Sequence, residues 1–157
     1  MGEYKASVTW ERSGERFTDN RYSRAHLWEF DGGLRVPASA SPQVVPVPLS
    51  DPAGVDPEEA FVAALSSCHM LWFLFTAAKR GFTIDSYRDD AVGTMEKDAE
   101  GRLAITKVTL RPRIRFSGSE IPDSREIDDM HDESHHQCFI ANSVRTNVTV
   151  ELPKSAP

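Results

Sequence analysis

DPEEAFVAALSSCHMLWFLFTAAKRG, residues 56–81, is the stretch that decides the fold. It has the signals of a helix at both ends. Asp56 suits the N-cap position, Pro57 the first helical position, and Glu59 the third residue of a capping box. The other end carries basic residues that suit the negative end of the helix dipole and a glycine that can end the helix: Lys79, Arg80 and Gly81. The sequence therefore predicts a helix over Pro57–Arg80.

Apolar side chains surround this helix instead of forming one stripe, so we expect it to be buried on nearly all sides. A membrane span is the alternative, because residues 60–78 are nearly long enough to cross a bilayer. Polar residues interrupt that run, and each is costly in lipid: Ser66, Ser67, His69 and Thr76. A chain of 157 residues has little material with which to wrap such a helix. We therefore expect no membrane partner and a homodimer built around the helix.

Length and composition indicate one globular domain over residues 1–157. Hydrophobic residues make up 39% and charged residues 27%, which is ordinary for such a domain. The formal net charge of −6, without a block of Lys or Arg, argues against a nucleic-acid partner. The first residues, Met1–Lys5, have no apolar signal core, so a cytoplasmic location is expected.

The residues before the helix predict strands and a long loop. Tyr4–Glu11 alternates apolar and polar residues, which is typical of a half-buried strand. His26–Phe30 predicts a second strand that ends at a turn over residues 31–33, and Leu34–Val36 a short return strand. Pro37–Gly54 is rich in proline, which excludes helix and central strand. This segment is predicted to be a loop leading into the helix.

The residues after the helix predict a hairpin, a helix and a last strand. We expect one long strand over Thr83–Lys97 and a return strand over Arg102–Phe116, with a bulge or edge near Thr106. Asp123–His136 predicts an acidic helix with a solvated face. Short helical turns over residues 137–144 and a strand over residues 145–152 complete an α+β domain.

The chain has two cysteines, Cys68 and Cys138. Cys68 lies midway along the predicted helix, where the adjacent His69 would point about 100° away and would not pair with it. Cys138 follows His135 and His136, and with the first cysteine these could form a thiolate–imidazole zinc site. No ligand pair has the usual metal-binding spacing. We therefore expect neither a metal nor another cofactor.

Three motifs in this order, over residues 54–60, 64–70 and 135–143, resemble the OsmC/Ohr family of thiol-dependent hydroperoxide reductases and their relatives. The stretch over residues 22–26, Tyr-Ser-Arg-Ala-His, is similar to an element of an OsmC-like subgroup. The resemblance implies an α+β fold in which an intertwined homodimer packs β-sheets around long central helices. It also implies two active sites at the dimer interface.

The resemblance further implies a role for individual residues. Cys68 matches the peroxidatic cysteine, Cys138 the resolving cysteine with which it forms an intramolecular disulfide, and Glu58 the family glutamate. The implied partners are a hydroperoxide substrate and an external dithiol reductant. The family arginine comes from the N-terminal region; Arg24 is the expected residue, and two others are alternatives, Arg16 and Arg21.

Thiol chemistry agrees with these roles. A thiolate attacks the hydroperoxide, an arginine supplies a permanent positive charge, and a carboxylate can hold that arginine through a bidentate pair. The resulting sulfenic acid condenses with a second thiol before further oxidation. Glu58 and Cys68 are ten residues apart, about 15 Å along one straight helix. Either the helix breaks between them, or Glu58 serves the cysteine of the other subunit.

Two departures from the family pattern keep other functions open. Phe139 follows the second cysteine where typical peroxidases of the family have a proline, and His69-Met70 follows the first, as in the OsmC-like subgroup. The alternative is a stress-associated small-ligand-binding protein with little turnover, whose apolar cleft Trp72 and Phe73 could line. A cysteine-dependent acyl hydrolase is a third hypothesis, without a convincing His and Asp/Asn arrangement.

Overall fold

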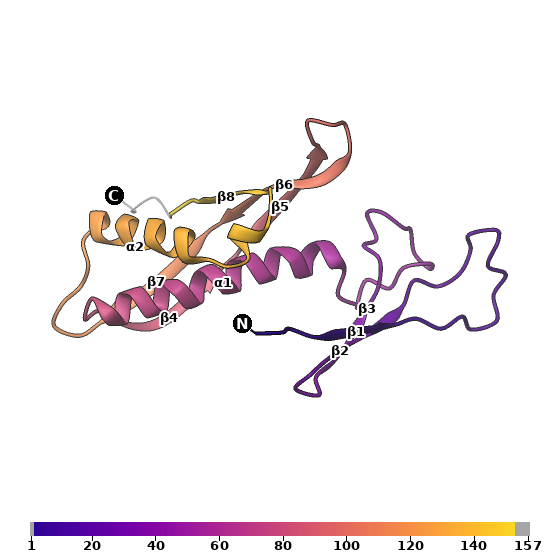
Figure 1. The fold of residues 1–157 in the computed structure, drawn as a ribbon, viewed down its shortest axis with the longest axis horizontal. Helices are drawn as coiled ribbons and strands as arrows, with labels where there is room; N and C mark the ends of the chain where they lie inside the picture. The colour runs from indigo at the N-terminus through magenta and orange to yellow at the C-terminus, as the bar shows by residue number, and fades with distance from the viewer. Residues whose placement is uncertain (1, 153–157) are drawn as a thin grey trace. The chain divides into compact units, whose positions relative to one another are not determined.

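The computed structural model describes residues 2–152. Over these residues the chain has two α-helices, one short 3₁₀ helix and eight strands, which confirms the mixed α+β class (Figure 1). The chain divides into two compact units, Met1–Ala60 and Phe61–Pro157. Each unit is described by itself, and one domain over residues 1–157 stays a prediction.

The first unit contains a three-stranded antiparallel sheet in the order β1-β2-β3. Its strands are β1 (Ala6–Thr9), β2 (His26–Phe30) and β3 (Arg35–Ala38). The bounds of β2 agree with the predicted strand over His26–Phe30. The strand predicted within Tyr4–Glu11 is present as β1, but it is shorter than predicted, and the predicted half-burial is wrong because all of its residues are exposed.

The first unit has almost no apolar interior. Within residues 2–60 the buried side chains are small, namely Ala38, Ser39, Ser41 and Ser50. Polar contacts order the long loop instead: the Asp51 N–H donates to Ser39 Oγ at 2.9 Å. A Cβ on Gly54 would come within 2.9 Å of the carbonyl carbon of Ala38, so this close approach requires glycine. A unit with so little buried apolar surface has little to offset its chain entropy.

Helix α1 (Pro57–Lys79) ends one residue earlier than predicted, and its start and stop signals act as expected. Asp56 Oδ1 accepts from the Glu59 N–H at 2.7 Å, and Glu59 Oε1 accepts from the Asp56 N–H at 2.9 Å, which completes the capping box. Gly81 follows the helix with φ of +87°, the left-handed conformation that favours glycine.

The expectation that α1 is buried on nearly all sides is wrong for the single chain. A single stripe of the helix is buried, formed by Leu65, His69, Phe73, Thr76 and Ala77. Leu71 and Phe75 are 60% and 58% exposed. By length and composition α1 could cross a membrane. Its buried stripe packs against strands and a second helix, which is how the core helix of a globular domain behaves.

The second unit contains two small sheets. In the first, β4 (Thr83–Asp89) pairs antiparallel with β7 (Pro112–Ser117). In the second, β6 (Leu103–Leu110) lies between β5 and β8. The edge strands of that sheet are β5 (Val92–Lys97), antiparallel to β6, and β8 (Asn147–Val150), parallel to it.

The single strand predicted over Thr83–Lys97 is wrong, because the chain changes sheets after Asp89. The carboxylate of Asp89 accepts hydrogen bonds from Ser66 Oγ and from the Arg111 N–H, which lies between β6 and β7, where the predicted return strand over Arg102–Phe116 also divides. These contacts hold the end of β4 at the junction of the two sheets. The irregularity expected near Thr106 is confirmed as a register shift in the β5–β6 pairing.

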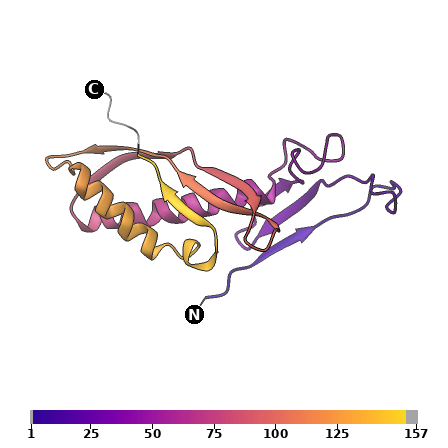
Figure 2. The same cartoon turned by 90° about the horizontal axis from the view of Figure 1, so that it is seen from above.

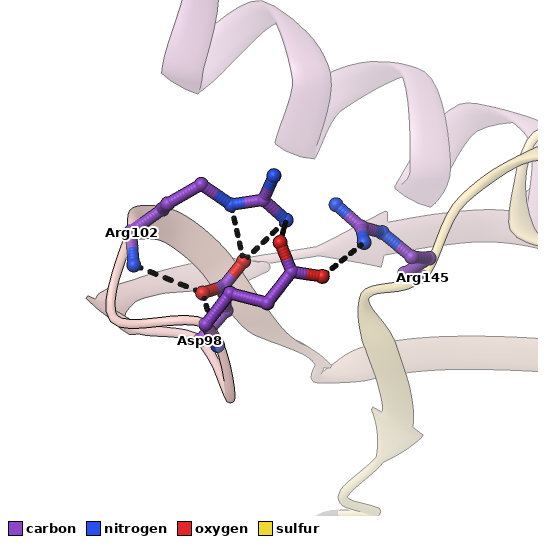
Figure 3. A network of polar contacts seen from close by, with 4 residues as sticks. Asp98, Arg102 and Arg145 are labelled. Carbon is purple, nitrogen blue, oxygen red and sulfur yellow. Dashed lines mark hydrogen bonds and ion pairs between the residues drawn. The ribbon is translucent and has the colours of Figure 1, made fainter.

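A charged turn closes the β5–β6 hairpin (Figure 3). Asp98 accepts from the Arg102 N–H at 2.9 Å and from the Arg102 guanidinium, and Glu100 bridges that arginine to Arg145. The Arg102 N–H, more than any other group, holds the pKa of Asp98 below its usual value. These hydrogen bonds and ion pairs order the turn. Because the turn is exposed, they add little to the free energy of unfolding.

Helix α2 (Ser124–Gln137) begins with a capping box between Asp123 and Glu126. Figure 2 shows α1 and α2 on the same side of the strands of the second unit. Between these layers lie two apolar cores. One is built around Leu65, Val108 and Leu110, and the other around Phe73, Ala77 and Met130. A 3₁₀ helix, η1 (Ala141–Ser143), follows α2 and leads into β8.

Candidate active site

Cys68 lies in the middle of α1, on a segment held at both ends by its caps. Its side chain is half-buried, and it is a free thiol. The helix runs without a break from Glu58 to Cys68, so the first of the two possibilities for this pair, a broken helix, is not observed. The second possibility, that Glu58 contributes to the active site of the other subunit's cysteine, stays a prediction.

Cys138 is the C-cap of α2, and its side chain is buried at 1% exposure. The thiol accepts from the Ala141 N–H at 3.4 Å, and the Cys68 side chain lies close enough to raise its pKa. The fold thus brings both cysteines of the chain together. Burial, followed by the contact with Cys68, raises the pKa of Cys138 to about 11. At neutral pH Cys138 is therefore a protonated thiol.

An apolar cavity of about 330 Å³ opens beside Cys68. The other lining residues come from α1 and from the segment after α2: Leu71, Trp72, Phe75 and Phe139. Trp72 meets Phe75 and Phe139 edge to face, with ring centroids 5.6 and 5.5 Å apart. These rings present apolar surface directly next to a thiol, which suits an organic group better than a small polar one.

Arg24 belongs to the first unit, where local contacts hold its side chain. Its guanidinium donates to the Asn20 side chain at 2.8 Å and to the carbonyl oxygens of Asn20 and Tyr22, and it lies 3.9 Å above the Tyr22 ring. Arg16 and Arg21, the alternatives, are exposed. Within residues 2–152 no carboxylate lies at ion-pair distance from Arg24, so its pairing with a glutamate stays a prediction.

Two hydrogen bonds of the His26 ring hold the backbone at Arg24. The Trp28 indole N–H, which can only donate, donates to His26 Nε2 at 3.0 Å. His26 Nδ1 therefore carries the proton and donates to the carbonyl oxygen of Arg24 at 2.8 Å. Both ring nitrogens of His26 are thus hydrogen-bonded, and the ring fixes the backbone carbonyl of Arg24.

Glu58 lies in the first turn of α1, and its side chain is half-buried. Its Oε2 atom is shielded from water and has no hydrogen-bond partner among the described residues. A shielded carboxylate oxygen of this kind is where an arginine would be most effective.

The histidine that sequence reasoning missed is His131, on α2. His69 does not face Cys68; its Nε2 lies 2.9 Å from Nδ1 of His131, and both rings are buried. The spacing of His131 from Ile127 and Ser134 on the inner face of an otherwise acidic helix was the available signal. Over residues 2–152, no group of three or more His, Cys, Asp or Glu side chains is arranged to hold a metal ion.

The site therefore defines a class: an α+β protein that juxtaposes a half-buried and a buried thiol beside an aromatic cavity. The family model of OsmC-like proteins matches residues 50–153. No curated protein matches the chain in sequence. The chain belongs to the OsmC-like family, whose members include hydroperoxide reductases. A redox or peroxide-related function is the activity that this membership supports.

Solved structures agree. An OsmC-like protein of unknown function from Vibrio cholerae is 58% identical, with a TM-score of 0.96 over 98% of this chain and 100% of that one. The OhrB organic hydroperoxide resistance protein of Bacillus subtilis has a TM-score of 0.63 at 20% identity, over 96% and 98% of the two chains. An organic hydroperoxide resistance protein from Legionella pneumophila has a TM-score of 0.66 at 17% identity, over 97% of each chain. The latter two show a shared fold.

Proposed function

We propose that this protein is a thiol-dependent peroxidase that reduces organic hydroperoxides. The observation that carries the proposal is the proximity of Cys138 to Cys68 at the edge of an apolar cavity. In the first step the Cys68 thiolate attacks the terminal peroxide oxygen and the O–O bond breaks. Cys68 becomes a sulfenic acid, and the alkoxide leaves as an alcohol after taking a proton from water.

In the second step the Cys138 sulfur attacks the sulfenic sulfur of Cys68. A disulfide forms, and the sulfenic oxygen leaves as water with the thiol proton of Cys138. An external dithiol then reduces the disulfide by exchange. The raised pKa of Cys138 supports this order, because a buried protonated thiol is a poor first nucleophile. Cys68, half-buried and next to the cavity, is the better placed of the two to meet the substrate.

The active species in this proposal is a homodimer. The first unit buries only Ala38 and three serines, and β1 is exposed along its whole length. The exposed face of α1 carries Leu71 and Phe75. Both units thus expose large apolar side chains to solvent, which favours association with a second copy of the chain. In that dimer Arg24 would supply the charge that stabilises the Cys68 thiolate, and Glu58 would hold the arginine.

A small-ligand-binding protein with little turnover is the second candidate, and the aromatic lining of the cavity favours it independently of the thiols. Titration of free thiols after one equivalent of cumene hydroperoxide separates the two. The peroxidase should lose both thiols together within one turnover. Retention of both thiols, with the hydroperoxide unconsumed, would favour the binding protein.

A further inference from the structure

A buried pair of histidines joins the two helices that carry the cysteines. His69 on α1 is 1% exposed and His131 on α2 is 4% exposed. The hydrogen bond between His69 Nε2 and His131 Nδ1 is 2.9 Å long, and the rings are stacked with centroids 5.2 Å apart and an interplanar angle of 13°. Phe73 packs on His131 at 4.3 Å, so the second ring is held from two sides.

Both rings are neutral at physiological pH. Burial, followed by the nearby His135, lowers the pKa of His69 to about 4, although Asp89 acts in the opposite direction. Burial and the neighbouring His69 lower the pKa of His131 to about 3. In a neutral pair one ring nitrogen donates and the other accepts, so the pair has one directional hydrogen bond. A bond of this kind in a low-dielectric interior has a defined length and angle.

The position of the pair relates it to the thiols. His69 follows Cys68 directly on a continuous helix, and His131 lies seven residues before Cys138, about 10 Å along α2. Apolar packing between Phe73, Ala77 and Met130 brings the helices together without specifying how far one slides along the other. Among residues 2–152 the other polar contact across this boundary joins Arg80, just after α1, to Glu133 on α2 at 2.9 Å; it lies on the surface and contributes little.

We propose that His69 and His131 are positioning residues that set the separation of the Cys68 and Cys138 thiols and so control disulfide formation between them. The view that this disulfide forms during peroxide reduction rests on the proposed function. In that step Cys68–SOH and Cys138–SH yield the disulfide and water. Disulfide geometry tolerates only a narrow range of Cα separations, and a displacement of about 1 Å at a reacting centre can cost on the order of 10²-fold in rate. Neither histidine touches the reacting atoms.

The test compares two polar replacements of the same residue. His131→Asn places its amide near the position of Nδ1, where it can donate to or accept from His69, whereas His131→Gln places its amide near the position of Nε2, out of reach of that bond. The full-length protein is equilibrated with buffers of reduced and oxidised glutathione. The fraction of Cys68–Cys138 disulfide, measured by mass spectrometry after acid quenching, yields the effective concentration of one thiol at the other.

We expect the effective concentration to fall at least ~10-fold in His131→Gln and to stay within ~3-fold of the parent in His131→Asn. Arg80→Ala, which removes the surface contact between the same helices, should match the parent. Equal values for His131→Asn and His131→Gln, or a fall in Arg80→Ala as large as that in His131→Gln, would overturn the proposal. His69→Gln, which keeps a donor near the Nε2 position, gives a second comparison with His69→Asn if one His131 variant does not fold.

This equilibrium uses no peroxide. A parent protein that forms the disulfide with glutathione but does not react with hydroperoxide would contradict the proposed function. The comparison of the two His131 variants would still test the role of the histidines. A protein that consumes hydroperoxide while its two His131 variants behave alike would contradict the role of the histidines alone.

Discussion

The Cys138 thiol lies near the Cys68 side chain, which raises its pKa, and the two thiols differ in exposure. Cys138 is buried at the end of α2, while Cys68 is half-buried beside an apolar cavity on α1. In the proposed cycle this arrangement would put a second thiol near a sulfenic acid formed on the first. The difference in burial is the basis on which the proposal gives the two thiols different parts.

The first prediction separates the roles of the thiols. Cys68→Ser should abolish reaction with hydroperoxide, because Cys138 remains a protonated thiol at neutral pH. Cys138→Ser should consume one equivalent and then stop at the sulfenic or a higher acid. Single-turnover consumption with mass spectrometry of the product measures both. Sulfenate on Cys138 of a Cys68→Ser protein that still reacts would reverse the assignment.

The second prediction concerns the site arginine. Arg24→Ala should slow the first peroxide step by on the order of 10²-fold, because a fixed positive charge next to the thiolate is lost. Arg24→Lys should restore little of that rate, since the planar guanidinium is what fits the local acceptors. Stopped-flow rates for Arg16→Ala and Arg21→Ala serve as controls. A parent rate in Arg24→Ala with a loss in either control would identify another arginine.

The third prediction is an obligate homodimer. Because residues 2–60 have almost no apolar interior and α1 exposes Leu71 and Phe75, the folded chain should sediment as a dimer at micromolar concentration. The midpoint of thermal unfolding should also rise with protein concentration, as expected when folding and association are coupled. A folded monomer by sedimentation, with an unfolding midpoint independent of concentration, is the result that rules the dimer out.

The fourth prediction concerns substrate choice. Phe139→Ala removes one aromatic wall of the cavity and the edge-to-face partner of Trp72. Reaction with cumene hydroperoxide should slow by about 10-fold through lost apolar contact, while reaction with hydrogen peroxide should not change. Tyr4→Ala, at a residue that is 95% exposed, is the matched control. Equal losses for both peroxides would mean that Phe139 acts on the thiols rather than on the substrate.

The fifth prediction is loss of stability in acid. The pKa values of His69 and His131 are lowered to about 4 and about 3, so the unfolded chain binds more protons than the folded one below pH of about 6.5. Their contribution is complete above that pH and is lost as the pH falls toward 4. Each histidine should decrease the free energy of unfolding by up to about 1.4 kcal/mol per pH unit in this window.

Equilibrium denaturation between pH 7 and pH 4 measures this slope, with the double variant His69→Gln/His131→Asn as the control. The double variant should lose less stability per pH unit, because neither replacement takes up a proton. Asp98, whose pKa is also lowered, acts below this window, since its unfolded value is 3.8. Parallel slopes for the parent and the double variant would show that other groups govern acid unfolding.

Local features were predictable from the sequence because their physics is local. The capping box of Asp56 and Glu59 joins residues three apart, and the left-handed Gly81 depends on one residue's own φ. The apolar and aromatic residues of His26–Phe30, followed by a glycine turn, were sufficient to place β2. The motifs around Cys68 and Cys138 indicated the family, which the match over residues 50–153 confirms.

Tertiary structure alone decided which distant segments meet. Continuous β propensity over Thr83–Lys97 could not reveal that Asp89 ends one strand and that the next belongs to another sheet. An apolar α1 could not reveal which stripe is buried, because the neighbouring layers determine this. The bond between His69 and His131 joins residues 62 apart, and only the packing of two helices brings them within 2.9 Å. Helix periodicity orients each residue on its own helix, whereas the choice of neighbour depends on how the separate elements pack.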